Sequence, residues 1–216
     1  DWTENPYRAL GLEAFNSRSK DFDVGTVGAG AGALAAMQKG GLGSVSLKLE
    51  NGYTVGALVV VNPFGSVTTS GGKHFWAAPF EFENEFGGAG IDSSPGPFDL
   101  KHSSKNKAMK VHSDQISNTT IAIVATDAPL SKTQCYRMAV AAHDGMVRAI
   151  VPSHTLYDGD LVFALSTKKG EIDHETFRDI GVASAVCLSR AIARGVYEAT
   201  TDEDDILPTY KKTNCI

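Results

Sequence analysis

Two absences set the first limits on what this sequence can do: it has no excess of positive charge and no long apolar run. Lysine and arginine total 20 against 25 aspartate and glutamate, which gives a formal net charge of -5. A protein that binds nucleic acid depends on neutralising phosphates, so no nucleic-acid partner is expected. No apolar run approaches the roughly 20 residues that span a bilayer, and residues 1–6 lack the basic and apolar regions of a signal peptide. We therefore expect a cytoplasmic protein with no membrane partner.

Cysteine is scarce, and the histidines are scattered. The three cysteines, Cys135, Cys187 and Cys215, are odd in number, and no metal-ligand spacing surrounds the first two. They are expected to be reduced packing residues. Ligand spacing is also missing among the six histidines, which are His74, His102, His112, His143, His154 and His174. The sequence therefore predicts neither a metal site nor a bound cofactor.

The residues that are present point to one packed α/β domain. The chain has 216 residues, of which 42% are hydrophobic and 21% are charged, ordinary values for a globular protein. Residues 44–50 alternate between apolar and polar side chains, Asn51-Gly52 is a strong hairpin signal, and residues 53–61 form the return strand. This pattern predicts an antiparallel pair whose second strand is buried on both faces.

The second half of the chain alternates strand and helix patterns. Residues 119–126 and 161–167 are apolar, partly β-branched runs typical of strands. Ser131 and Gln134 form a capping box that predicts a helix start, and residues 173 to about 200 predict a second, long helix. The inward face expected of the first helix is Cys135, Met138, Ala139, Ala142, Met146, Val147 and Ile150, and that of the second is Phe177, Ile180, Ala183, Val186, Cys187, Ala191 and Val196. Layers of helices on a mixed sheet fit this order best.

Two further segments have a distinctive composition. Seven glycines fall between Gly25 and Gly43, which must bend sharply or approach another part of the chain closely, and we interpret this segment as a helix start. It approximates a dinucleotide-binding fingerprint, but that motif requires a parallel crossover, and Glu50, its acidic partner, is followed directly by the hairpin turn. Nucleotide binding is therefore disfavoured. The acidic residues 202–205 are expected to be solvated.

Periodicity disappears between Asn62 and about Ser117, a stretch with several prolines and glycines. So long a structureless insertion is unusual in a compact domain. It indicates a lid, an interface segment or a processing loop, and a disordered surface loop is the alternative. It also contains a basic cluster made of Lys101, Lys105, Lys107 and Lys110.

Candidate catalytic chemistry begins where this insertion ends. Thr119 opens a buried strand, which holds its hydroxyl rigidly. If the peptide bond before Thr119 is cut, the new α-amine, with an intrinsic pKa of about 8, lies on the same residue as the hydroxyl. Nucleophile and general base then come in one amino acid. The alternative is that a Thr-Thr strand start only reflects β-propensity.

Two turns carry polar groups that suit such a site. Asp158 and Asp160 flank Gly159 just before a strand, so both carboxylates can point into one cleft and act on the amine. An ordinary Asp-Gly turn is the alternative. Asn62 follows a buried strand, and its side-chain amide can donate to an oxyanion, unless it is only the first residue of an Asn-Pro turn.

Five segments in a fixed order join these pieces. They are residues 27–33 (VGAGAGA), 39–44 (KGGLGS), 55–62 (VGALVVVN), 118–130 (NTTIAIVATDAPL) and 158–167 (DGDLVFALST). Together they resemble the DmpA-like family of self-processing N-terminal-nucleophile hydrolases, which contains the L-aminopeptidase/D-esterase, the β-peptidyl aminopeptidases and the nylon-oligomer hydrolase. The resemblance covers nearly the whole chain. It is nearest to the nylon-oligomer branch, because Asn-Thr stands at the junction and Asp-Gly-Asp in the turn.

The resemblance implies an α/β fold, a four-layer αββα sandwich made as an inactive precursor that cuts itself into two associated chains. Cleavage is implied between Asn118 and Thr119. Residues 1–118 then supply part of the larger subunit, and residues 119–216 are the smaller subunit, the two forming one structural domain. Relatives also have a longer N-terminal portion, with strands and a tyrosine that lines the site, for which this sequence shows no counterpart before Asp1.

The resemblance also implies roles for individual residues. Thr119 becomes the N-terminal nucleophile, Asp158 and Asp160 position and tune its amine, and Asn62 supports the oxyanion. Lys39 is implied near the site, and a solvated lysine at a helix end is the alternative.

The substrate implied by the nearest branch is a linear amide oligomer, such as one of 6-aminohexanoate, hydrolysed through an acyl-enzyme. An aminopeptidase or esterase that acts on free N-terminal amines is the alternative, because the carboxylates of the turn can also bind an ammonium group. A third interpretation is an uncleaved binding or assembly module that keeps the fold without the chemistry. Relatives assemble as tetramers of cleaved protomers, so self-association is expected.

Overall fold

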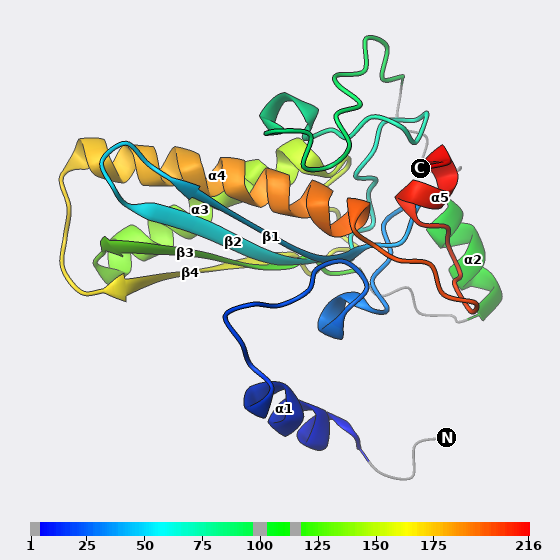
Figure 1. Cartoon of the computed structure of the whole chain (residues 1–216), viewed down its shortest axis with the longest axis horizontal. Coiled ribbons are helices and arrows are strands. Elements are labelled where there is room, and N and C mark those ends of the chain that lie inside the picture. Colours follow the sequence, from blue (N-terminus) through cyan, green and yellow to red (C-terminus); the bar gives the residue numbers. More distant parts are fainter. Residues whose placement is uncertain (1–4, 97–102, 113–117) are drawn as a thin grey trace.

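The strands form one mixed sheet in chain order. The computed structural model describes residues 5–96, 103–112 and 118–216. In it, β1 (Gly41–Lys48) and β2 (Thr54–Val61) form the expected hairpin, β2 pairs antiparallel with β3 (Ile121–Pro129), and β3 pairs parallel with β4 (Leu161–Lys168). Figure 1 shows the four strands side by side. The strand predictions and the α/β class are confirmed.

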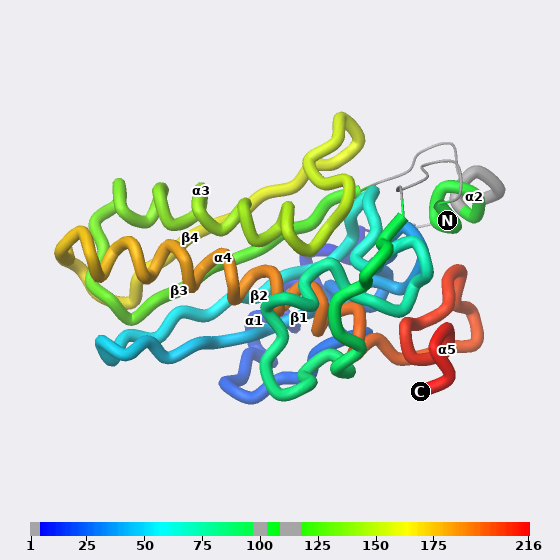
Figure 2. The backbone as a smooth tube through the Cα atoms, turned by 90° about the horizontal axis from the view of Figure 1, so that it is seen from above, coloured from blue at the N-terminus to red at the C-terminus, as the bar shows by residue number. Residues whose placement is uncertain are grey.

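Two long helices cover one face of this sheet. Helix α3 (Lys132–Ala149) packs over β4 and β3, and α4 (His174–Tyr197) packs over β1 and β2, so the two helices lie side by side in Figure 2. The predicted capping box is confirmed, because the Ser131 hydroxyl accepts from the Gln134 N–H and the Gln134 side chain accepts from the Ser131 N–H. Val147, expected on the inner face of α3, is 51% exposed. The buried residues of α3 are Met138, Ala142, Gly145, Met146 and Ala149, which keep to a narrower stripe.

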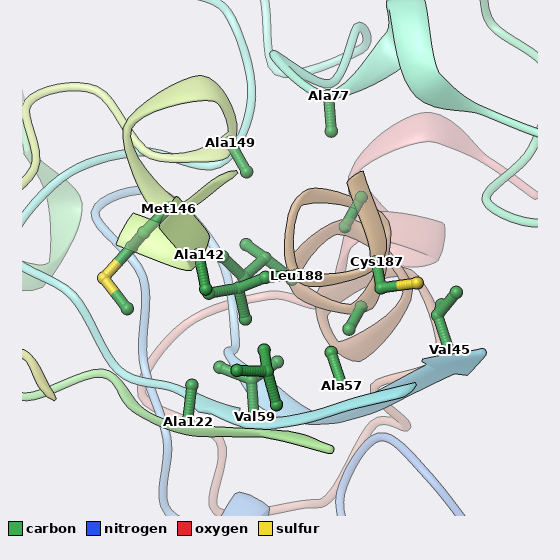
Figure 3. Close-up of a cluster of buried hydrophobic side chains, with 14 of the residues drawn as sticks. Val45, Ala57, Val59, Ala77, Ala122, Ala142, Met146, Ala149, Cys187 and Leu188 are labelled. Carbon is green, nitrogen blue, oxygen red and sulfur yellow. The ribbon is translucent and has the colours of Figure 1, made fainter. Parts of the chain in front are cut away.

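The core lies between the helices and the sheet. Leu188 of α4 sits at its centre, between Ala142 of α3 and Val59 of β2 (Figure 3). Burial raises the pKa of the Cys187 thiol to about 12, which fits the packing role expected for it. By length and hydropathy α4 would suffice to cross a membrane, but 72% of its apolar window is buried inside the fold. It is therefore the core helix of this domain.

The glycine-rich segment approaches the long helix closely, as expected, but it does not begin an α-helix. It contains one 3-10 turn, η1 (Gly28–Gly30), and then enters β1. A Cβ at Gly43 would lie 1.8 Å from the carbonyl oxygen of Ala191. Only glycine therefore lets β1 and α4 pack at this distance. The expectation of a helix start was wrong, because these glycines serve close backbone packing.

The insertion between Asn62 and Ser117 is more ordered than predicted. It contains η2 (Ala78–Phe80) and α2 (Ser104–His112). Within its described residues, four apolar side chains are buried in the main core, so much of this part is neither a free lid nor a surface loop; they are Val67, Phe75, Ala77 and Phe86. Lys101 of the basic cluster lies outside the described residues.

Two short helices frame the domain. Helix α1 (Tyr7–Asn16) has no buried residue and projects away from the sheet in Figure 1. Helix α5 (Tyr210–Asn214) is anchored by Tyr210, whose ring packs against Phe75 with centroids 4.5 Å apart. The periodicity of the sequence predicts neither helix, since both are too short for a clear amphipathic pattern.

The second face of the sheet is apolar and open in the described part of the chain. It holds an apolar hollow of about 320 Å³, and Phe163 at its rim is 64% exposed. Besides Phe163, the outward side chains lining it include Leu42, Leu58, Ile121, Ile123 and Leu161. The prediction that the return strand is buried on both faces was therefore wrong, because Thr54, Gly56, Leu58 and Val60 are only half-buried. The described residues supply one sheet and one helical layer of the expected four-layer sandwich.

Candidate active site

Strand direction brings four of the predicted site residues to one end of the sheet. Because β2 runs antiparallel to β3 and β3 runs parallel to β4, the end of β2 meets the starts of β3 and β4. Asn62 follows β2, Thr119 precedes β3, and Asp158 and Asp160 precede β4. The Thr119 N–H donates to the Asn62 carbonyl oxygen at 2.9 Å. This is the end of the sheet that faces α2 and α5 in Figure 1.

Two donors converge on the carbonyl oxygen of Asn118. The Thr119 hydroxyl donates to it at 2.5 Å, and the Gly159 N–H donates to it at 3.0 Å. Asn118 also pairs with Asp158 in a parallel bridge, so the backbone of the Asp-Gly-Asp turn continues the β3–β4 ladder. The hydroxyl of Thr119 therefore lies against the one peptide carbonyl that it would have to attack in a self-cleavage.

Gly159 lies directly against this hydroxyl. A Cβ at Gly159 would be 2.9 Å from Thr119 Oγ1, closer than real Cβ contacts allow. A larger residue here would push the Thr119 hydroxyl out of this position. The residue of the Asp-Gly-Asp turn that faces the threonine side chain is thus the glycine between the two aspartates.

Asp158 fastens the loop that follows β2. Its Oδ1 accepts from the Phe64 N–H at 2.8 Å, and its Oδ2 accepts from the Thr155 N–H at 3.0 Å and the Thr155 hydroxyl at 2.6 Å. These donors fix the carboxylate between two loops. Asp158 therefore links the segment after β2 to the turn before β4.

Asp160 is held in the same way, on the other side of Gly159. Its Oδ1 accepts from the Thr120 N–H at 2.8 Å, and its Oδ2 accepts from the ring Nδ1 of His154 at 3.0 Å and from the His154 N–H at 3.3 Å. The Asp160 side chain is only 2% exposed. Its hydrogen bond to Thr120 fixes the backbone immediately after Thr119.

The orientation of the Asn62 amide is set by two donors. Its Oδ1 accepts from the Leu34 N–H at 3.0 Å and from the ammonium of Lys105 at 3.1 Å. Because the oxygen faces these donors, the NH₂ group of the amide is turned away from them. Leu34 of the glycine-rich segment thus helps to hold the Asn62 side chain in place.

Lys105 is a buried cation next to the site. Its side chain comes from α2, the residue is 1% exposed, and its ammonium also donates to the carbonyl oxygens of Leu34 at 2.7 Å and Pro63 at 3.1 Å. Burial lowers its pKa to about 8, and the negative charge of Asp158 opposes this shift. Sequence reasoning placed Lys105 in a basic cluster of a loop. No side-chain pattern could have shown it, since most of its acceptors are backbone carbonyls.

The Lys39 ammonium has other partners. It is buried, forms an ion pair with Asp205 and donates to the Thr200 carbonyl oxygen at 3.1 Å. The contact ties the segment before β1 to the chain after α4, and a role of Lys39 in the chemistry stays a prediction. The expectation that residues 202–205 are all solvated was wrong for Asp205, because it is the partner of this buried lysine. Among the described residues, no cluster of three or more His, Cys, Asp or Glu is arranged to hold a metal ion.

The buried ammonium of Lys105 makes stability depend on pH. The unfolded chain holds this proton up to about pH 10.5 and the folded chain only up to about pH 8. Between these values the unfolded state binds more protons, so we expect the free energy of unfolding to rise with pH, by roughly 3 kcal/mol over the window. Urea denaturation at pH 7, 8.5 and 10 measures this rise.

Lys105→Met should lose this pH-dependent rise, because the titrating group is removed. Lys107→Met is the matched control, since Lys107 is an exposed lysine of the same helix, and it should keep the slope of the unmodified protein. Equal slopes for the Lys105→Met variant and the unmodified protein between pH 8 and 10 would show that the ammonium is not buried.

Comparison with known proteins bears on the family and the fold of this chain. The family model described as "Peptidase family S58" matches residues 3–205. An uncharacterized aminopeptidase of Mycobacterium tuberculosis is 36% identical over 97% of this chain, and a 6-aminohexanoate-oligomer endohydrolase of Kocuria is 30% identical over 79% of it. The solved structure of an L-aminopeptidase D-Ala-esterase/amidase from Ochrobactrum anthropi, described as a variant of the Ntn hydrolase fold, superposes on 91% of this chain with a TM-score of 0.61 and 19% identity.

The matches cover only part of those proteins. The chain spans 62% of the mycobacterial protein, 47% of the Kocuria protein and 52% of the Ochrobactrum chain. The structural likeness establishes the Ntn-hydrolase fold, and the family model covers most of the chain from end to end. The resemblance found in the five segments is thereby confirmed: the chain belongs to peptidase family S58.

Proposed function

We propose that the protein carrying this chain is a self-processing amide-bond hydrolase whose nucleophile is Thr119. The observation that carries the proposal is the position of the Thr119 hydroxyl, 2.5 Å from the carbonyl oxygen of Asn118, while the Gly159 N–H holds the same oxygen at 3.0 Å. A nucleophile beside a carbonyl and a backbone donor on that carbonyl are the two parts that acyl transfer needs.

The first step is an acyl shift within the chain. The Thr119 hydroxyl oxygen attacks the carbonyl carbon of Asn118, and the developing oxyanion keeps the hydrogen bond from Gly159. The C–N bond then breaks, the nitrogen of Thr119 takes up the proton that leaves the hydroxyl, and an ester joins the two residues. Water hydrolyses this ester, which leaves a carboxylate on Asn118 and a free α-amine on Thr119.

The same residue then turns over substrate. The neutral amine of Thr119 accepts the hydroxyl proton while the oxygen attacks the amide carbon of the substrate, and the departing amine receives that proton. Water resolves the acyl-enzyme. Asn62, with its NH₂ group turned away from Lys105, supports the oxyanion, and Asp158 and Asp160 orient the amine. The predicted role of Lys39 is not assigned to a step of this scheme, and its ammonium is paired with Asp205.

The two products of the cut, residues 1–118 and 119–216, stay together as one domain in this proposal. The new chain begins with β3, which pairs with β2 of the first product and β4 of the second. The apolar outer face of the sheet supports the further proposal that a second sheet packs there, as in the expected αββα sandwich. We also propose that the enzyme works in the cytoplasm as an assembly of cleaved protomers.

The relatives support one substrate class over the other. We propose a linear amide with a free N-terminal amine, because the proteins named aminopeptidases share 36 to 40% identity with this chain, against 29 to 30% for the 6-aminohexanoate-oligomer endohydrolases. Internal cleavage of 6-aminohexanoate oligomers is the second candidate, favoured by the Asn-Thr junction and the Asp-Gly-Asp turn.

Substitution of Thr119 tests the nucleophile. We expect the purified protein to separate into two fragments on a denaturing gel, the second with Thr119 at its N-terminus, and Thr119→Ala to remain one uncut and inactive chain. Thr119→Ser should still be cut, since it keeps a hydroxyl. Intact mass spectrometry locates the cut.

Thr120→Ala is the matched control for Thr119→Ala. Thr120 is the neighbouring residue, and its buried hydroxyl oxygen has no hydrogen-bond partner among the described residues, so this variant should be cut normally. A Thr119→Ala protein that is cut and active would rule out Thr119 as the nucleophile. A single uncut band without amide turnover in the unmodified protein would favour the binding module instead.

Gly159→Ala tests the packing of the hydroxyl. Its Cβ would displace Oγ1 of Thr119, so we expect cleavage between Asn118 and Thr119 to slow by about tenfold to a hundredfold. Gly181→Ala, whose added Cβ would have its nearest contact at 3.7 Å, should cleave at the normal rate. Densitometry of the two fragments over time gives the cleavage rate of each variant. Equal rates for Gly159→Ala and Gly181→Ala would show that the position of the hydroxyl does not depend on this contact.

Blocked and free oligomers separate the two substrate classes. We compare 6-aminohexanoate oligomers and short peptides, each with a free or an N-acetylated amine, by chromatography of the products. An enzyme that recognises the ammonium group should hydrolyse the free forms at least tenfold faster. Equal hydrolysis of acetylated and free oligomers would establish internal cleavage as the activity.

A further inference from the structure

A chain of two histidines ends on Asp160. The ring Nδ1 of His154 lies 3.0 Å from Asp160 Oδ2, and the ring Nε2 of His154 lies 3.3 Å from Nδ1 of His143, a residue of α3. The two rings meet edge to face, with centroids 5.0 Å apart. Asp160 in turn accepts from the Thr120 N–H. The histidines therefore connect α3 to the backbone that follows Thr119.

The chemistry of the groups sets the direction of these hydrogen bonds. A carboxylate only accepts, so Nδ1 of His154 carries the hydrogen that it shares with Asp160. In a neutral imidazole the other nitrogen is then an acceptor, and Nε2 of His154 receives the Nδ1 hydrogen of His143. All three bonds are satisfied together when Asp160 is ionised and a single hydrogen lies between the two facing histidine nitrogens.

The surroundings favour this arrangement. Burial and the neighbouring His154 lower the pKa of His143, against the opposing charges of Asp160 and Asp144, so His143 tends to stay neutral. The backbone of His154 has φ 54°, a conformation uncommon for residues other than glycine. This conformation lets both the N–H and the ring of His154 reach the same oxygen of Asp160.

We propose that His154, braced by His143, is a positioning residue that holds the Asp160 carboxylate against the Thr120 N–H and so keeps Thr119 aligned for attack. One carboxylate oxygen of Asp160 accepts from the Thr120 N–H, and the other accepts from His154. Without His154 the carboxylate can rotate, and the backbone next to the nucleophile loses a fixed acceptor. The inference rests on the proposed function and adds a pair of residues to which that function assigns no part.

The arrangement also predicts a response to acid. The bond between the two rings survives one added proton, because one of the facing nitrogens can still accept. A second proton places two N–H groups face to face, and the brace from α3 is lost. The charged groups that face this pair are Asp160 from the turn and Asp144 from α3. We therefore expect self-cleavage to slow at acid pH. This step precedes the formation of the Thr119 amine, so the amine does not contribute to its pH dependence.

The experiment follows self-cleavage of the whole protein that carries this chain, made by cell-free translation, from pH 5 to 8. We expect His154→Ala to cleave about tenfold to a hundredfold more slowly at pH 8. His154→Asn should come within about threefold of the normal rate, because its NH₂ group replaces the Nδ1 donor and Asn tolerates positive φ. It should also lose the slowing at acid pH. His174→Asn, at an exposed histidine of α4, is the control and should retain both the rate and the pH profile.

An independent measurement covers the case in which the His154 variants do not fold. In the uncut Thr119→Ala protein, labelled with ¹⁵N-histidine, the nitrogen chemical shifts should show His154 protonated at Nδ1 and unprotonated at Nε2 at pH 8. The opposite tautomer, or normal cleavage and pH profile in His154→Ala, would overturn the proposal. Cleavage of the Thr119→Ala protein itself would overturn the proposed function, while the nitrogen shifts would still report on His154.

Discussion

The parallel pairing of β3 with β4 is the constraint on which the site depends. It places the Asp-Gly-Asp turn beside the start of β3, where the Gly159 N–H reaches the Asn118 carbonyl oxygen and the Leu161 N–H reaches that of Thr120 at 3.1 Å. A shift by one residue would send the Thr119 side chain to the opposite face of the sheet. The register is fixed on the inner face by Ala122 and Val124, which are buried under the helices. Core packing and the geometry of the site are therefore set by the same strand.

Around this ladder, buried polar groups of the site are satisfied mostly by backbone. Asp158, Asp160 and Lys105 each bind at least two main-chain groups. Buried charges are tolerated only when such partners are present. Because the partners belong to loops after β2, before β4 and in the glycine-rich segment, the charges also join these loops. The same hydrogen bonds thus stabilise the fold and, in the proposed function, keep Thr119 aligned.

Much of the fold could be predicted from local patterns. The hairpin at Asn51-Gly52, the capping box at Ser131 and the apolar strand before Asp127 each have a short-range physical cause, and all three are present. The convergence of Thr119, Asn62 and the Asp-Gly-Asp turn could be expected from the family resemblance, and strand direction explains it. Lys105 and the Lys39–Asp205 pair could not be predicted, because they join segments far apart in sequence without a periodic pattern. The order of residues 62–96 was missed for the same reason.

The place of Thr119 in the sheet has one more consequence. Chain ends usually fray, because the first residues of a segment have neighbours on one side at most. An N-terminus created at Thr119 would instead open a strand that is bordered by β2 on one side and β4 on the other. Its amine would lie at a half-buried position, where its conformational freedom is small. A newly made terminus of this kind is ordered from the moment it forms, which is the condition for an amine to serve as a catalytic group.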